Sequence, residues 1–183
     1  MTDQEFLDVF GSWVGSLKED ATAIRAGYEL EGAEREAKRI LVAGLSYLLR
    51  KIDIVPDYLG GLGSVDDAMV LRLTAAKALA HGLAGLDGEI TDRLTKMAGE
   101  VKVVEEFLGD DYAAFERYVD SLPDMAVRGR TADAVLDDAG LAEQFGYELN
   151  DELKSYEIRP IEGGDKAIRE LRSFVRAKVN KKK

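Results

Sequence analysis

Apolar residues recur with a helical period along almost the whole chain. Between Phe6 and Leu17 they return at spacings of three and four, which gives a helix of about four turns with one apolar face. Another helix, the third along the chain, is expected to begin at Ser64, an N-cap residue with Asp67 three positions on in a capping-box relation. The same pattern predicts further helices at 32–50, 94–108, 112–123, 131–145 and 165–178.

Strand-like alternation is confined to residues 157–161, and Pro160 limits that segment to a sheet edge or an extended loop. We therefore expect an all-α fold, a compact helical bundle of six to eight helices built around a central helical hairpin. The domain interpretation is a single helical domain over 1–183, or two lobes, 1–86 with the hairpin (33–78) and 87–183 with a basic final helix.

Composition is that of a soluble domain, with 46% hydrophobic and 33% charged residues in 183. Because the chain has no cysteine, it has no disulfide, thiolate metal site or cysteine nucleophile, and a reducing compartment suits it. The acidic start lacks the basic and apolar regions of a secretory signal. The apolar run 68–86 contains Arg72, Lys77 and His81, which are costly in a bilayer. We expect a cytoplasmic protein.

Charge divides the chain into an acidic body and a basic tail. Residues 166–183 contain eight basic residues and one acid, so they carry +7, and residues 1–165 carry −17 of the total of −10. Affinity for nucleic acid requires basic side chains that replace counterions on the phosphates. The body would repel nucleic acid, which is therefore not an expected partner.

The connection between the second and third helices is the most distinctive segment. Residues 47–71 contain one proline, three glycines and four aspartates between two apolar helices. The stretch 52–57, followed by 63–67, resembles the bacterial YkvA-like family, also called domain of unknown function 1232. The resemblance covers 33–78, although Lys51 stands where the family usually has proline. It implies a helical hairpin and supplies no established activity.

Each residue of this connection has a structural interpretation. Pro56 ends the second helix, and Asp53 or Asp57 can accept hydrogen bonds from exposed turn amides. Asp66 and Asp67 lie in the first turn of the third helix, where the dipole favours negative charge by about 0.3 to 1 kcal/mol each. The motif positions with a structural role are Ile52, Pro56, Gly63 and Ser64.

A functional interpretation of the same aspartates is a metal site. Four carboxylates close together repel one another unless a cation neutralises them, and Mg²⁺, Mn²⁺ or Ca²⁺ takes oxygen ligands of this kind. Arg50 and Lys51 could neutralise them instead, and we favour capping and ion pairing over metal. The candidate metal ligands are Asp53, Asp57, Asp66 and Asp67.

The basic final helix has an apolar stripe formed by Ile168, Leu171 and Val175. Such a helix can bind a partner or lie on an anionic membrane. It can equally pack on its own acidic body, which we favour because the charges are complementary.

The expected function is a non-enzymatic helical module that acts through a protein partner or as a homo-oligomer, with no cofactor. One alternative is a metal-dependent enzyme that uses the four aspartates. Another is a peripheral membrane protein that uses the final helix.

Overall fold

The computed structural model describes residues 1–50, 54–83 and 85–180, without the side chains of Asp57 and Tyr58. The prediction of an all-α fold is confirmed, and the described residues contain no β-strand. The described residues contain ten α-helices, and three successive pairs, α1–α2, α5–α6 and α8–α9, are each separated by a single residue. Of the three junction residues only Asp138, between α8 and α9, is extended, so α1–α2 and α5–α6 can each be counted as one bent helix, which gives eight. The elements are α1 (Asp3–Gly15), α2 (Leu17–Glu29), α3 (Arg35–Tyr47), η1 (Asp57–Ser64), α4 (Val65–His81), α5 (Gly88–Gly99), α6 (Val101–Leu108), η2 (Gly109–Asp111), α7 (Tyr112–Asp120), η3 (Leu122–Asp124), α8 (Ala132–Asp137), α9 (Ala139–Ser155) and α10 (Asp165–Val179).

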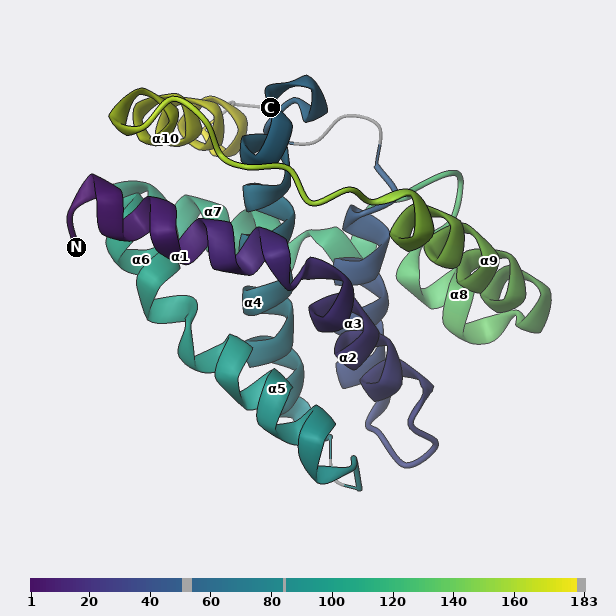
Figure 1. The fold of residues 1–183 in the computed structure, drawn as a ribbon. Coiled ribbons are helices and arrows are strands. Elements are labelled where there is room, and N and C mark those ends of the chain that lie inside the picture. Colours follow the sequence, from purple (N-terminus) through teal and green to yellow (C-terminus); the bar gives the residue numbers. More distant parts are fainter. Residues whose placement is uncertain (51–53, 84, 181–183) are drawn as a thin grey trace.

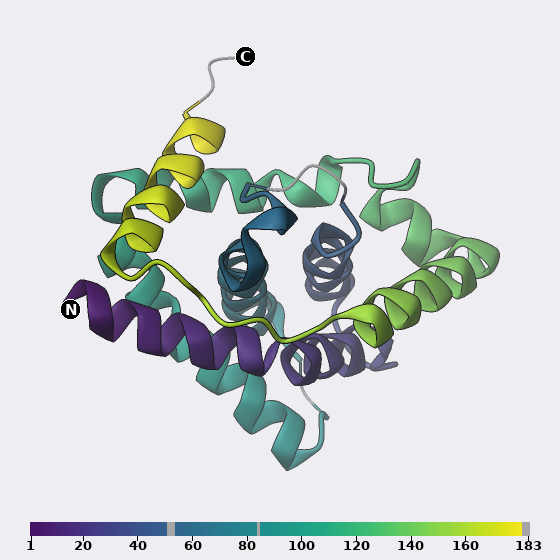
Figure 2. The ribbon, with the colours of Figure 1, turned by 45° about the horizontal axis from the view of Figure 1, so that its top comes forward.

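The hairpin of α3 and α4 lies at the centre of the molecule, as expected (Figure 1). Figure 2 shows both helices nearly end-on, with the other helices arranged around them. Gly44 of α3 faces Thr74 of α4 so closely that a Cβ at Gly44 would overlap the Thr74 hydroxyl. Glycine is therefore required where the two central helices cross.

Two helix predictions needed correction. No helix was expected for most of α2, because its buried face consists largely of alanine and glycine and includes the buried Asp20, which weakens the apolar signal. The single helix expected at 131–145 is interrupted at Asp138, whose side chain accepts a hydrogen bond from the Leu141 amide (2.9 Å) and begins α9. This second helix continues to Ser155 because Phe145 and Leu149 are also buried.

The capping box expected at Ser64 is wrong. Ser64 makes no side-chain capping hydrogen bond, and its backbone (φ −102°, ψ 0°) lacks the extended conformation of an N-cap residue. The physical reason is that η1 already coils the chain up to Ser64, so α4 continues directly from a preceding helical turn.

The two halves of the chain share one hydrophobic core, since α4 contacts α5, α6 and α7. The connection between α9 and α10 crosses η1, where the Gly61 amide donates to the Pro160 carbonyl (3.3 Å). A Cβ at Gly61 would overlap the Arg159 carbonyl, so this crossing also depends on glycine. The segment 157–161, expected to be an edge strand or an extended loop, has no regular secondary structure.

The final helix packs against α1, α7 and η2. Ile168, Leu171 and Val175 are fully buried there, and the Arg176 guanidinium pairs with Asp111 (2.7 Å). Among the described helices, none has the length and apolar character needed for a membrane crossing.

Candidate functional site

Asp66 is the acceptor that joins the two central helices to the turn between them. Its Oδ2 accepts hydrogen bonds from the Tyr47 hydroxyl (2.6 Å), the Ile54 amide (3.0 Å) and the Val55 amide (3.2 Å). The Ile54 amide also donates to the Tyr47 hydroxyl oxygen (3.1 Å). We call these four residues the Asp66 cluster. Tyr47 ends α3 and Asp66 lies in the first turn of α4, so the cluster fixes how the hairpin closes.

The Asp66 carboxyl is completely buried, and burial raises its pKa to about 6 from an ordinary value of 3.8. The hydrogen bonds from Tyr47, Val55 and Ile54 oppose this rise because they stabilise the ionised form. Burial, reinforced by the Asp66 charge, raises the pKa of the Tyr47 hydroxyl well above 10. The other oxygen, Asp66 Oδ1, is buried without a hydrogen-bond partner in the part of the chain described.

Of the four candidate metal ligands, the structure describes the side chains of two, Asp66 and Asp67. Asp53 lies outside the described residues, as does the side chain of Asp57, and Ile52 of the motif lies outside them too. Asp66 belongs to the Asp66 cluster, whereas Asp67 is half-buried and lines a surface pocket. Within the described residues, no three acidic or histidine side chains are grouped so that they could hold a metal ion.

The pocket beside the motif has a volume of about 220 Å³ and lies between η1 and the segment after α9. Arg50, Ser64, Asp67 and Arg159 contribute polar groups to its walls. Tyr156 also lines it and donates a hydrogen bond to the Val14 carbonyl (2.9 Å). Both charge signs occur in the walls, so the pocket has no clear preference for an anion or a cation.

The expectation that Pro56 ends the second helix is wrong, because α3 already ends at Tyr47. Pro56 precedes η1 with φ −67° and ψ 132°, and its carbonyl accepts from the Leu59 amide (3.0 Å). Gly63 is buried within η1. These positions shape the path of the chain from the turn into α4.

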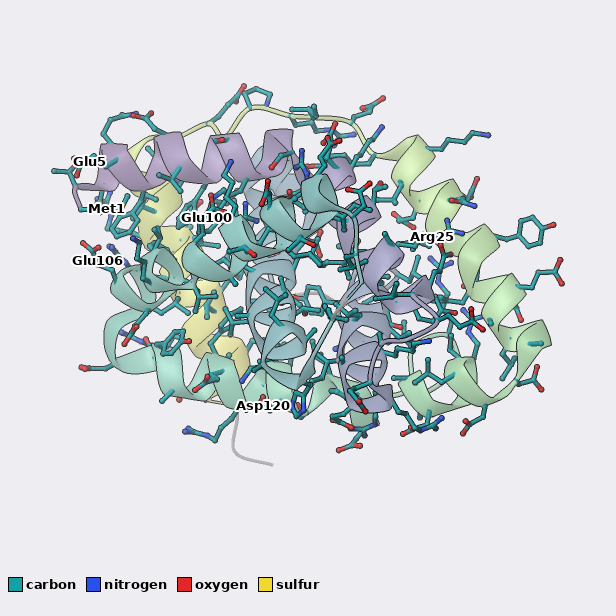
Figure 3. All side chains as sticks on the ribbon, turned by 90° about the horizontal axis from the view of Figure 1, so that it is seen from below. Met1, Glu5, Arg25, Glu100, Glu106 and Asp120 are labelled. Carbon is teal, nitrogen blue, oxygen red and sulfur yellow. The ribbon has the colours of Figure 1, made fainter. Side chains whose placement is uncertain are left out.

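Sequence reasoning missed a buried ionic network around Arg72. The Arg72 guanidinium pairs with Asp20 (3.3 Å) and Glu100 (2.7 Å) and lies 3.9 Å from the centroid of the Trp13 ring. Arg93 pairs with the other Asp20 oxygen (2.9 Å). The network joins α1, α2, α4 and α5, with Glu100 at the junction of α5 and α6 (Figure 3). An arginine between Leu71 and Leu73, in the apolar stretch 68–76, was the available signal.

A second missed feature is a surface groove between α2 and the α8–α9 pair. It consists of two neighbouring pockets of about 640 Å³ and 340 Å³ that share Tyr28, Glu29 and Ala142. Tyr147 lines the smaller pocket and is 68% exposed. The Arg25 guanidinium of α2, labelled in Figure 3, donates a hydrogen bond to the side-chain oxygen of Asn150 in α9 (2.6 Å). The apolar residues along this groove are Tyr28, Ala33, Val135, Leu136, Ala139 and Ala142.

Comparison with known families supports the resemblance seen in the sequence. Residues 37–73 match the family described as "Protein of unknown function (DUF1232)", and this segment holds most of α3, the turn and the first half of α4. The match includes the whole Asp66 cluster and about a fifth of the chain. No curated protein and no solved structure matches the chain significantly.

Proposed function

We propose that this protein is a non-enzymatic helical module that acts by associating with a second copy of itself through the groove between α2 and α8–α9. The observation that carries the proposal is the position of Tyr147. It is the most exposed large hydrophobic side chain of the described residues, and it stands beside a groove with apolar side chains along its wall, charged side chains at its edges and room for a ring.

A projecting aromatic residue and a partly apolar groove on one face can be self-complementary. In a two-fold dimer the same surface serves both subunits, so Tyr147 of each copy can enter the groove of the other. Aromatic side chains supply much of the binding energy at the centre of protein interfaces. Burial of a tyrosine and of the apolar groove wall therefore gives this association a driving force.

The charges at the groove edges also fit a two-fold arrangement. Lys38 and Arg35 line the α3 side, whereas Asp137 and Glu143 line the α8–α9 side. Arg35 pairs with Asp137 within one chain (2.8 Å), but both side chains are more than half exposed. Exposed ion pairs contribute little to stability, so these groups can exchange partners across an interface at small cost.

The two alternative functions have weaker support. The Asp66 oxygen that accepts three hydrogen bonds already has a structural task, which lowers its value as a metal ligand in an enzyme. The apolar stripe of α10 is buried against the body, so the helix presents mainly its basic side chains to solvent. A membrane anchor would require α10 to leave the body.

The proposal is tested by sedimentation equilibrium between about 5 µM and 1 mM protein. The wild type should dimerise, and Tyr147→Asp should weaken the dimer at least tenfold because a charge would enter the apolar groove. The matched control is Ile158→Asp, since Ile158 is 64% exposed and follows α9 outside the groove. A wild type that stays monomeric, or equal weakening by both variants, would overturn the proposal.

A further inference from the structure

The turn between η3 and α8 contains Arg128, whose φ of 50° is the one positive φ of a non-glycine residue in the described part of the chain. Arg128 and Gly129 (φ 82°) form the tip of a two-residue turn, in which Val127 and Arg130 exchange both backbone hydrogen bonds (2.8 and 3.0 Å). Asparagine or glycine is favoured at the first of these positions, because other side chains are strained at positive φ. An arginine holds this conformation only where surrounding contacts fix it.

The Arg128 side chain joins the end of α3 to α9, and we call its contacts the Arg128 bridge. Its Nε donates to the Leu49 carbonyl (3.0 Å), and its terminal nitrogens pair with Glu148 (3.2 Å) and Glu152 (3.4 Å) of α9. Leu49 is buried and follows α3, which ends at Tyr47. Carbonyls at a helix end lack an intrahelical partner, and an arginine can supply the missing donor.

Apolar packing alone fixes α9 only in part. Of its 17 residues, Phe145 and Leu149 are the buried ones, and the Phe145 ring contacts that of Tyr28 in α2 (centroids 6.2 Å apart). Two apolar side chains one turn apart hold a helix against its neighbour but allow it to roll about its axis. Glu148 and Glu152 are four positions apart and share a second face of α9, so the Arg128 bridge opposes that rotation.

The orientation of α9 decides where Tyr147 points. The Tyr147 ring is 68% exposed, so its direction is set chiefly by the helix that carries it. Tyr147 directly precedes Glu148, and a rotation that moved one of these side chains would move the other by the same angle. Arg130 also holds Glu148 (3.0 and 2.5 Å), and Arg128 adds the contacts with the end of α3 and with the next turn of α9.

We propose that Arg128 is a positioning residue for self-association, because it holds α9 in the orientation that lets Tyr147 enter the groove of a second copy. This inference rests on the proposed function and adds a residue on which that function depends. Arg128 lines neither pocket of the groove, so its effect on association is exerted through α9.

The first test is sedimentation equilibrium of Arg128→Asn. Asparagine before Gly129 gives a favoured two-residue turn, so the turn should form although the bridge is lost. Relief of strain and loss of contacts change the free energy of unfolding in opposite directions, so the midpoint of urea denaturation should stay close to that of the wild type. The dimer should weaken at least about threefold. The matched control is Arg169→Gln, which removes the same charge from an exposed position on α10 and should leave the dimer unchanged.

A second variant breaks the bridge without altering the turn. Glu152 is 45% exposed, so Glu152→Gln should fold, and it should weaken the dimer in the same direction as Arg128→Asn. If Arg128→Asn does not fold, Glu152→Gln decides the question. A lower urea midpoint with an unchanged dimer would show that the bridge serves stability alone and would overturn the proposal.

Hydrogen exchange of the monomer, at a concentration too low for association, tests the orientation of α9 directly. In Arg128→Asn, the amides of residues 145–152 should exchange faster than in the wild type, whereas those of α4 should not change. Unchanged exchange in α9, or a wild-type dimer that neither variant weakens, would overturn the role of Arg128 alone. A wild type that stays monomeric would overturn the proposed function and this inference together.

Discussion

Substitution of Asp66 should change both the stability of the protein and its dependence on pH. In Asp66→Ala, two buried donors lose their acceptor, namely the Tyr47 hydroxyl and the Val55 amide, whereas the Ile54 amide keeps the Tyr47 hydroxyl oxygen. Each unsatisfied buried donor costs about 1–3 kcal/mol. We therefore expect a loss of at least about 2 kcal/mol, more than the about 0.3 to 1 kcal/mol that the sequence assigns to a first-turn charge.

The pH dependence follows from the raised pKa of Asp66. A folded-state value of about 6 against 3.8 means that the folded protein binds the proton more tightly than the unfolded chain. The resulting stabilisation is fully present below about pH 3.8 and is lost as the pH rises through about 6. At 1.36 kcal/mol per pKa unit, this amounts to about 3 kcal/mol.

The assay is urea denaturation of the wild type and Asp66→Asn between pH 4 and pH 8. The asparagine keeps an acceptor oxygen and removes the charge, so the wild type should gain roughly 2.4 kcal/mol relative to the variant as the pH falls from 8 to 4. Subtracting the variant's stability curve from that of the wild type removes the contributions of other titrating groups. One such group is Glu148, because its hydrogen bond from Arg130 lowers its pKa to about 2. The exposed control Asp110→Asn should show no such gain. A flat difference between wild type and Asp66→Asn would refute the argument.

Three further predictions concern the hairpin, the tail and metal. Gly44→Ala should destabilise the protein by about 1–3 kcal/mol in urea denaturation because its Cβ overlaps Thr74, and Thr74→Ala should restore part of the loss. Leu171→Asp should cost more than the about 2–5 kcal/mol of a buried leucine truncation, since it also buries a charge; unchanged stability would mean that α10 is not docked. Millimolar Mg²⁺, Mn²⁺ or Ca²⁺ should hardly move the melting temperature, whereas a bound metal at 100 times its Kd would stabilise by about 2.7 kcal/mol. A large shift abolished by Asp53→Asn or Asp57→Asn would establish the metal site instead.

The sequence alone determined the helical class, the central hairpin and the amphipathic character of the final helix. These features depend on periodic apolar residues and on a proline- and glycine-rich turn, which act locally. The sequence pattern did not predict most of α2, because alanines and Asp20 occupy much of its buried face and weaken the apolar periodicity. Its burial depends on neighbours distant in sequence, with Arg72 and Arg93 neutralising Asp20.

Only the tertiary structure separated Asp66 from Asp67. The two residues are chemically identical neighbours with the same sequence-level interpretation, but successive side chains on a helix point about 100° apart. Asp66 therefore points into the core and accepts three hydrogen bonds, whereas Asp67 lines a surface pocket. The groove beside Tyr147 was equally invisible in the sequence, because it is assembled from helices distant along the chain. Periodicity shows which face of a helix is apolar, and packing decides which of its polar groups are buried and what they contact.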